Sequence, residues 1–222
     1  MIPSPPVLTC SGLRKRFGDK LVFDHLTLSL GVGVVALTGE NGSGKSTLLS
    51  LLCGIHAPDA GDIVIAGHDL RKDPVRAKSR LAFVPDEPVA YDFMTGFEYL
   101  TMMLTLKRMR PEEHDPAILE RFHIDPYRHL QFKDMSLGTQ RKFMLAGGLL
   151  GKPAVLLMDE PTNGLDAASK ATLAALVNER RHDTLVLFST HDHVFMAMTE
   201  ACVLALPEAA AGHGTVALAV SA

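Results

Sequence analysis

Residues 39–47 read Gly-Glu-Asn-Gly-Ser-Gly-Lys-Ser-Thr and match the pattern G-x-x-x-x-G-K-[ST] at every fixed position. Glycines let backbone N–H groups close around phosphate oxygens, and the positive end of a following helix adds to the attraction. In this pattern the lysine reaches the β- and γ-phosphates, and the next hydroxyl can ligate Mg²⁺. A glycine-rich turn without function is the alternative. We expect a phosphate site made by Asn41, Gly42, Ser43, Gly44, Lys45, Ser46 and Thr47.

Two acidic residues, Asp159 and Glu160, directly follow the apolar run 154–158. A carboxylate at the end of a buried strand can hold the Mg²⁺ that bridges phosphate oxygens, which we expect of Asp159. Side chains alternate along a strand, so Glu160 points elsewhere and can polarise a water for attack on the γ-phosphate. Taken alone, the pair could equally be loop acids or a helix cap. Its place downstream of the glycine loop favours the catalytic interpretation.

His191 follows a second apolar run, 185–188, and is the histidine that we single out. A neutral imidazole there can hydrogen-bond the γ-phosphate and hold the attacking water together with Glu160. We interpret His193 as helix surface, and most of the other histidines as structural or solvent-facing. The predicted catalytic residues are therefore Lys45, Glu160 and His191.

The elements around these residues predict an α/β fold. The apolar run 32–37 before the glycine loop is typical of a buried strand, and the leucines after the loop have helical spacing. Residues 7–10 and 21–30 predict antiparallel strands joined by a turn at Gly18-Asp19, and residues 91–150 contain helical patterns. Asp166 is a sound N-cap for a following helix, and strands are expected near 202–206 and 215–220 around a Gly-rich turn. We expect a P-loop NTPase core with a mostly parallel sheet, an N-terminal antiparallel part and an inserted helical subdomain. Ligands of such sheets bind at the carboxyl ends of the strands.

Composition limits the class of protein. The chain has 222 residues, 47% of them apolar, and a net charge of −3, which argues against broad binding to nucleic acid. No run reaches the roughly 18 apolar residues of a membrane helix, and the N-terminus does not resemble a signal peptide. The three cysteines have no metal-ligand spacing, so we expect them to be small core residues in a reducing compartment.

Residues 136–140, Ser-Leu-Gly-Thr-Gln, are called here the signature stretch and predict the start of a helix. Ser136 can cap this helix and offer its hydroxyl to a phosphate, while Gly138 allows close backbone approach. Taken alone, the stretch predicts a helix cap and nothing more.

From about residue 7 to 206, the chain resembles the nucleotide-binding subunits of ATP-binding cassette (ABC) transporters. The ordered matches are the A-loop aromatic (Phe17), Walker A (39–47), the Q-loop region (83–88), the signature motif (136–140), Walker B (155–160), the D-loop (163–166) and the switch histidine (His191).

The resemblance implies ATP and Mg²⁺ as ligands, with Phe17 stacking on adenine and Ser46, Asp159 and Asp86 as metal ligands. It also implies that two subunits sandwich two nucleotides, and that a membrane-spanning permease subunit is driven from the cytoplasmic face. The residues implied to act across this dimer are Ser136, Gly138, Thr139, Gln140 and Asp166. The expected layout is a single domain, 1–222, in which 1–90 and 151–222 form a RecA-like core and 91–150 the helical subdomain.

Two departures from the family pattern stand out. Asp86 replaces the Q-loop glutamine, and Leu137 and Thr139 replace the glycines of the signature motif. The stretch 85–88, Pro-Asp-Glu-Pro, resembles ATPases of exporters with separate membrane subunits, so we expect an exporter ATPase for drug, antibiotic, peptide or lipid-like cargo. We expect it to be active because Ser136, Gly138, Glu160 and His191 are retained. The alternatives are a soluble ABC-type mechanoenzyme acting on nucleic acid or ribosomes, and a small-molecule P-loop kinase. The cargo, and whether the dimer pairs identical or sister chains, are left open.

Overall fold

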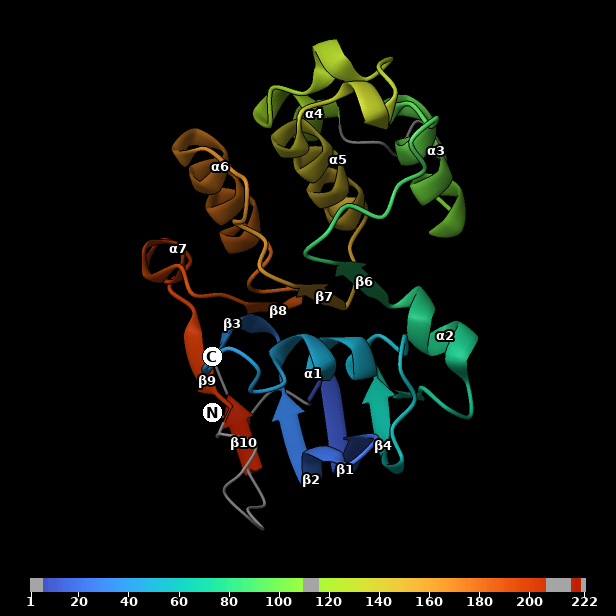
Figure 1. Ribbon diagram of the computed structural model, residues 1–222, viewed down its shortest axis with the longest axis vertical. Coiled ribbons are helices and arrows are strands. Elements are labelled where there is room, and N and C mark those ends of the chain that lie inside the picture. Colours follow the sequence, from blue (N-terminus) through green and yellow to red (C-terminus); the bar gives the residue numbers. More distant parts are fainter. Residues whose placement is uncertain (1–5, 110–115, 207–216, 221–222) are drawn as a thin grey trace.

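The computed structural model of the chain describes residues 6–109, 116–206 and 217–220, and contains two five-stranded sheets (Figure 1). The first sheet has the order β10-β2-β1-β4-β5, and the second has the order β6-β7-β8-β3-β9. In the first sheet the strands are β1 (Leu8–Phe17), β2 (Lys20–Leu30), β4 (Ala60–Ile65), β5 (His68–Asp69) and β10 (Ala217–Val220). In the second they are β3 (Gly33–Thr38), β6 (Leu81–Val84), β7 (Val155–Met158), β8 (Leu185–Ser189) and β9 (Cys202–Ala205).

All pairings in the second sheet are parallel, and every residue of β7 and β8 is buried. Strands covered on both faces need continuous apolar runs, which explains the unbroken Val, Leu and Met composition of β7. In the first sheet, β1 pairs antiparallel with β2, as the turn at Gly18-Asp19 predicts, and it also pairs antiparallel with β4. The predicted α/β fold with an antiparallel N-terminal sheet and a parallel sheet is confirmed.

Two apolar clusters lie on opposite faces of the parallel sheet. Helix α1 (Lys45–Leu52) is packed between the two sheets, because its buried leucines join one cluster with residues of β1, β3 and β8. The other cluster joins the opposite face of the parallel sheet to α3 (Gly96–Leu106), α5 (Leu137–Leu149), α6 (Ala167–Asn178) and α7 (His193–Met198). The remaining helices are α2 (Pro74–Ser79), α4 (Pro116–Arg121) and the 3₁₀ turns Asp125–Tyr127 and Phe132–Asp134.

Helices α3, α4 and α5 lie together at one end of the molecule, away from the antiparallel sheet (Figure 1). Methionines 94, 102, 103 and 109 pack against the core cluster there, as gap fillers should. The division into a core, 1–90 with 151–222, and a helical subdomain, 91–150, stays a prediction.

Two expectations concern the C-terminal strands β9 and β10. Strand β10 pairs in parallel with β2 in the first sheet, and the predicted Gly-rich turn before it lies outside the described residues. Cys10 and Cys53 are buried as expected, but the prediction of a core position is wrong for Cys202. Cys202 belongs to the edge strand β9, where three of four side chains are exposed. Within the described parts of the chain, no helix is long and apolar enough to cross a membrane.

Candidate nucleotide site

The loop between β3 and α1 has the backbone geometry of a phosphate cradle. Gly42 and Gly44 have φ values of 82° and 101°, and Gly44 caps α1 in a left-handed conformation. A Cβ on Gly44 would lie 2.9 Å from both the Phe23 ring and a methyl of Val22, so glycine is required there. The loop is therefore shaped by two constraints, the left-handed backbone and its packing against β2.

Two polar side chains of this loop, Lys45 and Ser43, differ in their hydrogen bonding. Lys45 Nζ donates to the carbonyl oxygens of Gly39 (2.8 Å) and Glu40 (3.2 Å), so the side chain folds back over the loop. The Ser43 hydroxyl is buried and has no hydrogen-bond partner within the described structure. A buried hydroxyl without a partner is unfavourable by about 1–3 kcal/mol, which an anion's oxygen would relieve. The loop therefore fits the phosphates of a nucleotide.

Asp159 and Glu160 are held at the end of β7 by one residue of the neighbouring strand, Ser189. The Ser189 hydroxyl donates to Asp159 Oδ1 at 2.5 Å and accepts from the backbone N–H of Glu160 at 2.8 Å. Glu160 has a φ of 42°, a left-handed conformation that costs a non-glycine residue about 1–2 kcal/mol. Ser189 was not predicted from the sequence, although its place at the end of an apolar strand beside β7 was the available signal.

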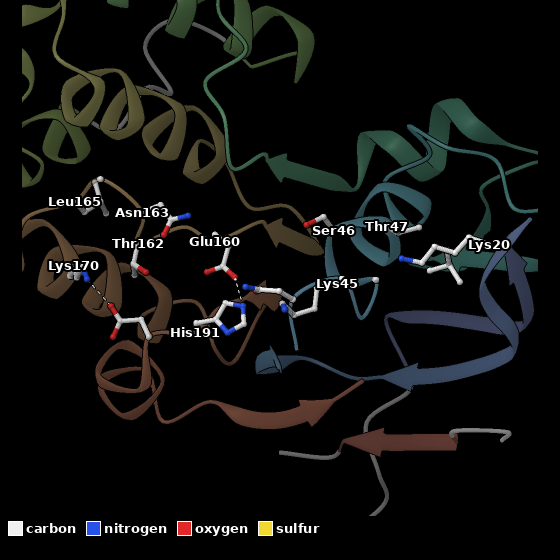
Figure 2. Close-up of a pocket in the computed structure, with 16 residues that line it drawn as sticks. Lys20, Lys45, Ser46, Thr47, Glu160, Thr162, Asn163, Leu165, Lys170 and His191 are labelled. Carbon is white, nitrogen blue, oxygen red and sulfur yellow. Dashed lines mark hydrogen bonds and ion pairs between the residues drawn. The ribbon is translucent and has the colours of Figure 1, made fainter. Parts of the chain in front are cut away.

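The carboxylate of Glu160 faces the imidazole of His191, as Figure 2 shows. Glu160 Oε1 lies 3.6 Å from His191 Nε2, and the His191 side chain is 53% exposed. Burial raises the pKa of the Glu160 carboxyl above its ordinary value, and the nearby His191 and Lys45 oppose this shift. The structure thus brings together the three residues predicted to be catalytic.

A single cavity of about 760 Å³ joins these groups to the loop. Its volume lies in the range of nucleotide-sized ligand sites. Two cations that the sequence did not single out, Lys20 and Lys170, also line it, and Lys170 Nζ pairs with Asp192 at 2.7 Å. The remaining lining residues are Val22, Asn41, Gly42, Gly44, Lys45, Ser46, Thr47, Glu160, Thr162, Asn163, Gly164, Leu165, His191 and Asp192.

Of the three predicted metal ligands, Ser46 lines the cavity, whereas Asp159 and Asp86 are not among its lining residues. Asp86 Oδ1 accepts from the Asn163 side-chain amide at 2.9 Å and lies 3.5 Å from the Arg141 guanidinium. No group of three His, Cys, Asp or Glu side chains that could hold a metal occurs among the described residues. Mg²⁺ is usually held by one or two protein oxygens together with substrate phosphates. Ser46 and Asp159 are the residues that would hold it.

Phe17 lies at the end of β1 and does not line the cavity. The residue is 43% exposed, and its ring meets His56 edge-on at 5.5 Å between centroids and lies 5.0 Å from Lys15 Nζ. Stacking of Phe17 on adenine stays a prediction.

The residues expected to act across a dimer are not among those that line this cavity. Ser136 is exposed and caps α5 by accepting from the Thr139 N–H at 3.2 Å, and Asp166 caps α6. Both predicted caps are confirmed. Gly138 lies so close to Gly164 that a Cβ would be 3.0 Å from its carbonyl oxygen, and Gln140 donates its amide to Phe132 O at 2.7 Å. In this single chain the signature stretch therefore does not line the cavity that contains the glycine loop.

A glycine loop at the end of a parallel strand, facing an acid and a histidine from neighbouring strands, defines a P-loop ATPase. Residues 23–163 match the family described as ABC transporter. The chain belongs to this family, and it is an ABC ATPase domain, which binds ATP with Mg²⁺ and hydrolyses ATP.

Individual relatives are similar over most of this chain. A Dictyostelium discoideum protein named ABC transporter A family member 8 is 34% identical over 82% of this chain and 23% of its own length. An uncharacterized ABC transporter ATP-binding protein of Bacillus subtilis (strain 168) is 30% identical over 84% of this chain and 61% of its own length. The chain thus spans less than two thirds of either relative. A solved structure of an ATP binding subunit of an ABC transporter has a TM-score of 0.85 at 27% identity, covering 91% of this chain and 87% of that one.

Proposed function

We propose that Glu160 is the general base for ATP hydrolysis in this chain and that His191 orients it. The observation that carries the proposal is the Glu160–His191 pair, 3.6 Å apart, which opens into the same cavity as the glycine loop. The raised pKa of Glu160 brings its basicity closer to that required for taking a proton from water near neutral pH. Lys45 and the loop N–H groups hold the phosphates, and bound Mg²⁺ would neutralise charge on their oxygens.

We further propose that two copies of the chain complete each site. Ser136 is exposed at the start of α5, and neither it nor the half-buried Gly138 lines the cavity of its own chain, so the start of this helix is available to a neighbour. The start of a 13-residue helix attracts anions through its unpaired N–H groups and its dipole. A second copy's signature stretch would then close the cavity over the γ-phosphate, and ATP would favour the closed pair by binding it more tightly.

The partner in transport is proposed to be a membrane-spanning permease subunit, contacted from the cytoplasmic side. Supporting this, large apolar side chains are exposed in and just after the segment that follows β6. Val89, Tyr91, Phe93 and Phe97 are each more than half exposed, and the Tyr91 and Phe93 rings stack at 5.3 Å. Asp86 belongs to the same segment and accepts from Asn163, which lines the nucleotide cavity, so a protein docked there would be linked to the nucleotide site. An exposed apolar group of this kind is typical of a protein-binding surface.

Export of the cargo is proposed on the resemblance of residues 85–88 to exporter ATPases. A matched relative of Caldanaerobacter subterraneus carries the name Ribose import ATP-binding protein RbsA and is 31% identical over 197 residues, so direction needs its own assay. Inside-out vesicles with the permease should accumulate cargo when ATP is added outside. Loss of cargo from preloaded vesicles would instead show import.

The catalytic proposal is tested by phosphate release from Glu160→Gln beside Glu120→Gln, a control on the exposed face of α4. We expect the first variant to lose about 100-fold or more in kcat, as general bases contribute, while it still binds ATP. The control should equal wild type. Turnover of Glu160→Gln within threefold of wild type would contradict the proposal. Phosphate released by wild type without any added acceptor would exclude the small-molecule kinase.

A further inference from the structure

Arg141 is a fully buried charged side chain on α5, one residue beyond the signature stretch. Its relative exposure is 2%. One guanidinium nitrogen, Nη1, donates to the carbonyl oxygens of Pro85 and Asp86, and the other, Nη2, donates to those of Asp159 (2.9 Å) and Glu160 (2.7 Å). A single side chain from the helical region therefore links the ends of two neighbouring strands, β6 and β7.

Burying this charge is costly, and its neighbours show what compensates for it. Desolvation of a charged side chain costs several kcal/mol unless hydrogen bonds and opposite charges offset it. Burial lowers the pKa of Arg141, and the carboxylates of Asp86, Asp159 and Glu160 act in the opposite direction. These compensating groups all belong to the segments that carry the predicted metal ligands and base. An apolar side chain could fill the same space, but it would hold none of these carbonyls.

The peptide groups of Glu160 are fixed on both sides by this arrangement. Ser189 accepts from its N–H, and Arg141 donates to its C=O. Glu160 needs such support because its φ of 42° is left-handed, and strained backbone persists only where surroundings hold it. With the backbone fixed, the carboxylate is directed toward His191.

We propose that Arg141 is a positioning residue for ATP hydrolysis, which fixes the backbone of Glu160 and couples it to α5 and to Asp86. Asp86 takes part because its carboxylate lies between the Arg141 guanidinium and the Asn163 amide. A movement of α5 relative to the sheet would therefore displace the base itself. The proposal rests on the proposed role of Glu160 as the base.

The test compares Arg141→Met and Arg141→Lys with Arg180→Met as a matched control. Arg180 also donates to backbone carbonyls, those of Leu176 (2.8 Å) and Leu149 (3.1 Å), but it does not line the nucleotide cavity. For each variant we would measure kcat, KM, the Kd of a fluorescent ATP analogue and Tm.

Arg141→Met should lose about 10- to 100-fold in kcat, because misplacing a catalytic group by about 1 Å has effects of this size. Its Kd for the analogue should stay within about threefold, since the glycine loop is untouched. The lysine variant should recover part of the lost kcat, and Arg180→Met should lower Tm without changing kcat of the folded protein. The proposal would be overturned if the Arg141 and Arg180 variants had equal kcat, or if kcat fell and Kd rose by similar factors.

Two further measurements keep the proposal falsifiable if Arg141→Met does not fold. Arg141→Lys keeps the positive charge, and Asp86→Asn removes the negative charge beside Arg141 while its amide oxygen can still accept from Asn163. If Asp86 acts through Arg141, the double variant Asp86→Asn/Arg141→Lys should be no slower than the slower single variant. If the losses in kcat of the two single variants instead multiply in the double variant, Asp86 and Arg141 act independently and the proposed coupling is overturned. Glu160→Gln assayed in parallel separates the two ideas, since full turnover there overturns both, whereas full turnover only in the Arg141 variants overturns the positioning role alone.

Discussion

Replacing Ser189 with alanine removes one hydroxyl that serves two buried groups of the site. The hydroxyl donates to Asp159 Oδ1 and accepts from the Glu160 N–H, and Ser189 itself has no exposed surface. Alanine fits the strand, so the change removes hydrogen bonds without adding bulk. We expect the variant to be less stable and slower in ATP hydrolysis.

The expected loss of stability follows from these two bonds. A hydrogen bond to a charged carboxylate contributes about 1.5–3 kcal/mol, and a buried N–H left unpaired costs about 1–3 kcal/mol. Water from the adjacent cavity can hydrate part of this site, so we expect a total loss of about 2–3 kcal/mol in the free energy of unfolding. Thr199→Val is the matched control, because its buried hydroxyl donates only to the neutral helix carbonyls of Phe195 and Met196. We expect the control to lose about 1 kcal/mol.

Urea unfolding without nucleotide measures both variants, with ΔG taken from midpoints at unchanged m values. Nucleotide must be absent because a bound ligand would add its own stabilisation. If Ser189→Ala loses no more free energy of unfolding than Thr199→Val, the hydroxyl does not hold the two acidic residues and the reasoning is refuted.

Three other predictions use different parts of the chain. Gly44→Ala should weaken binding of an ATP analogue and lower stability by about 1–3 kcal/mol more than Gly42→Ala, because only the first Cβ meets the Phe23 ring; equal losses by urea titration would contradict this. Lys107 donates to three carbonyls at the end of α5, and burial lowers its pKa from 10.5 to about 8. The unfolded chain then binds more protons between these values, so the stability of wild type relative to Lys107→Met should rise from pH 8 to 10.5, and a fall would refute the assignment. A thiol reagent should label Cys202 in the native protein, and Cys10 and Cys53 only after unfolding. Rapid labelling of all three cysteines in the native protein would contradict the burial of Cys10 and Cys53.

Local features of the sequence predicted much of the fold. Continuous apolar runs identified β7 and β8, because strands covered on both faces leave no room for polar side chains. Ser136 and Asp166 were predicted as caps, because the oxygen of a cap binds N–H groups only three residues away. Such short-range rules need no knowledge of which strands become neighbours.

The features of the site that the sequence did not predict depend on contacts between segments far apart in the chain. Ser189 acts on residues 29 and 30 positions away, because β7 and β8 are neighbours in the sheet. Arg141 looked like one more position on a helix, yet the packing of α5 against β6 and β7 buries it against four carbonyls. Periodicity does not tell strand order, so neither contact could be derived from it. Asp86 was expected beside the metal, and its pairing with Asn163 joins residues 77 positions apart.

The central claim is that the cavity of one chain is half of a site, which Ser136 of a second copy completes. The most direct measurement is the molecular mass of Glu160→Gln by sedimentation, with and without ATP and Mg²⁺. We predict a monomer that doubles in mass when ATP is present. Adding Ser136→Asp, which keeps a capping oxygen but places a negative charge against the γ-phosphate, should abolish the doubling. A mass that does not change with ATP, or a dimer that persists in the double variant, would contradict the claim.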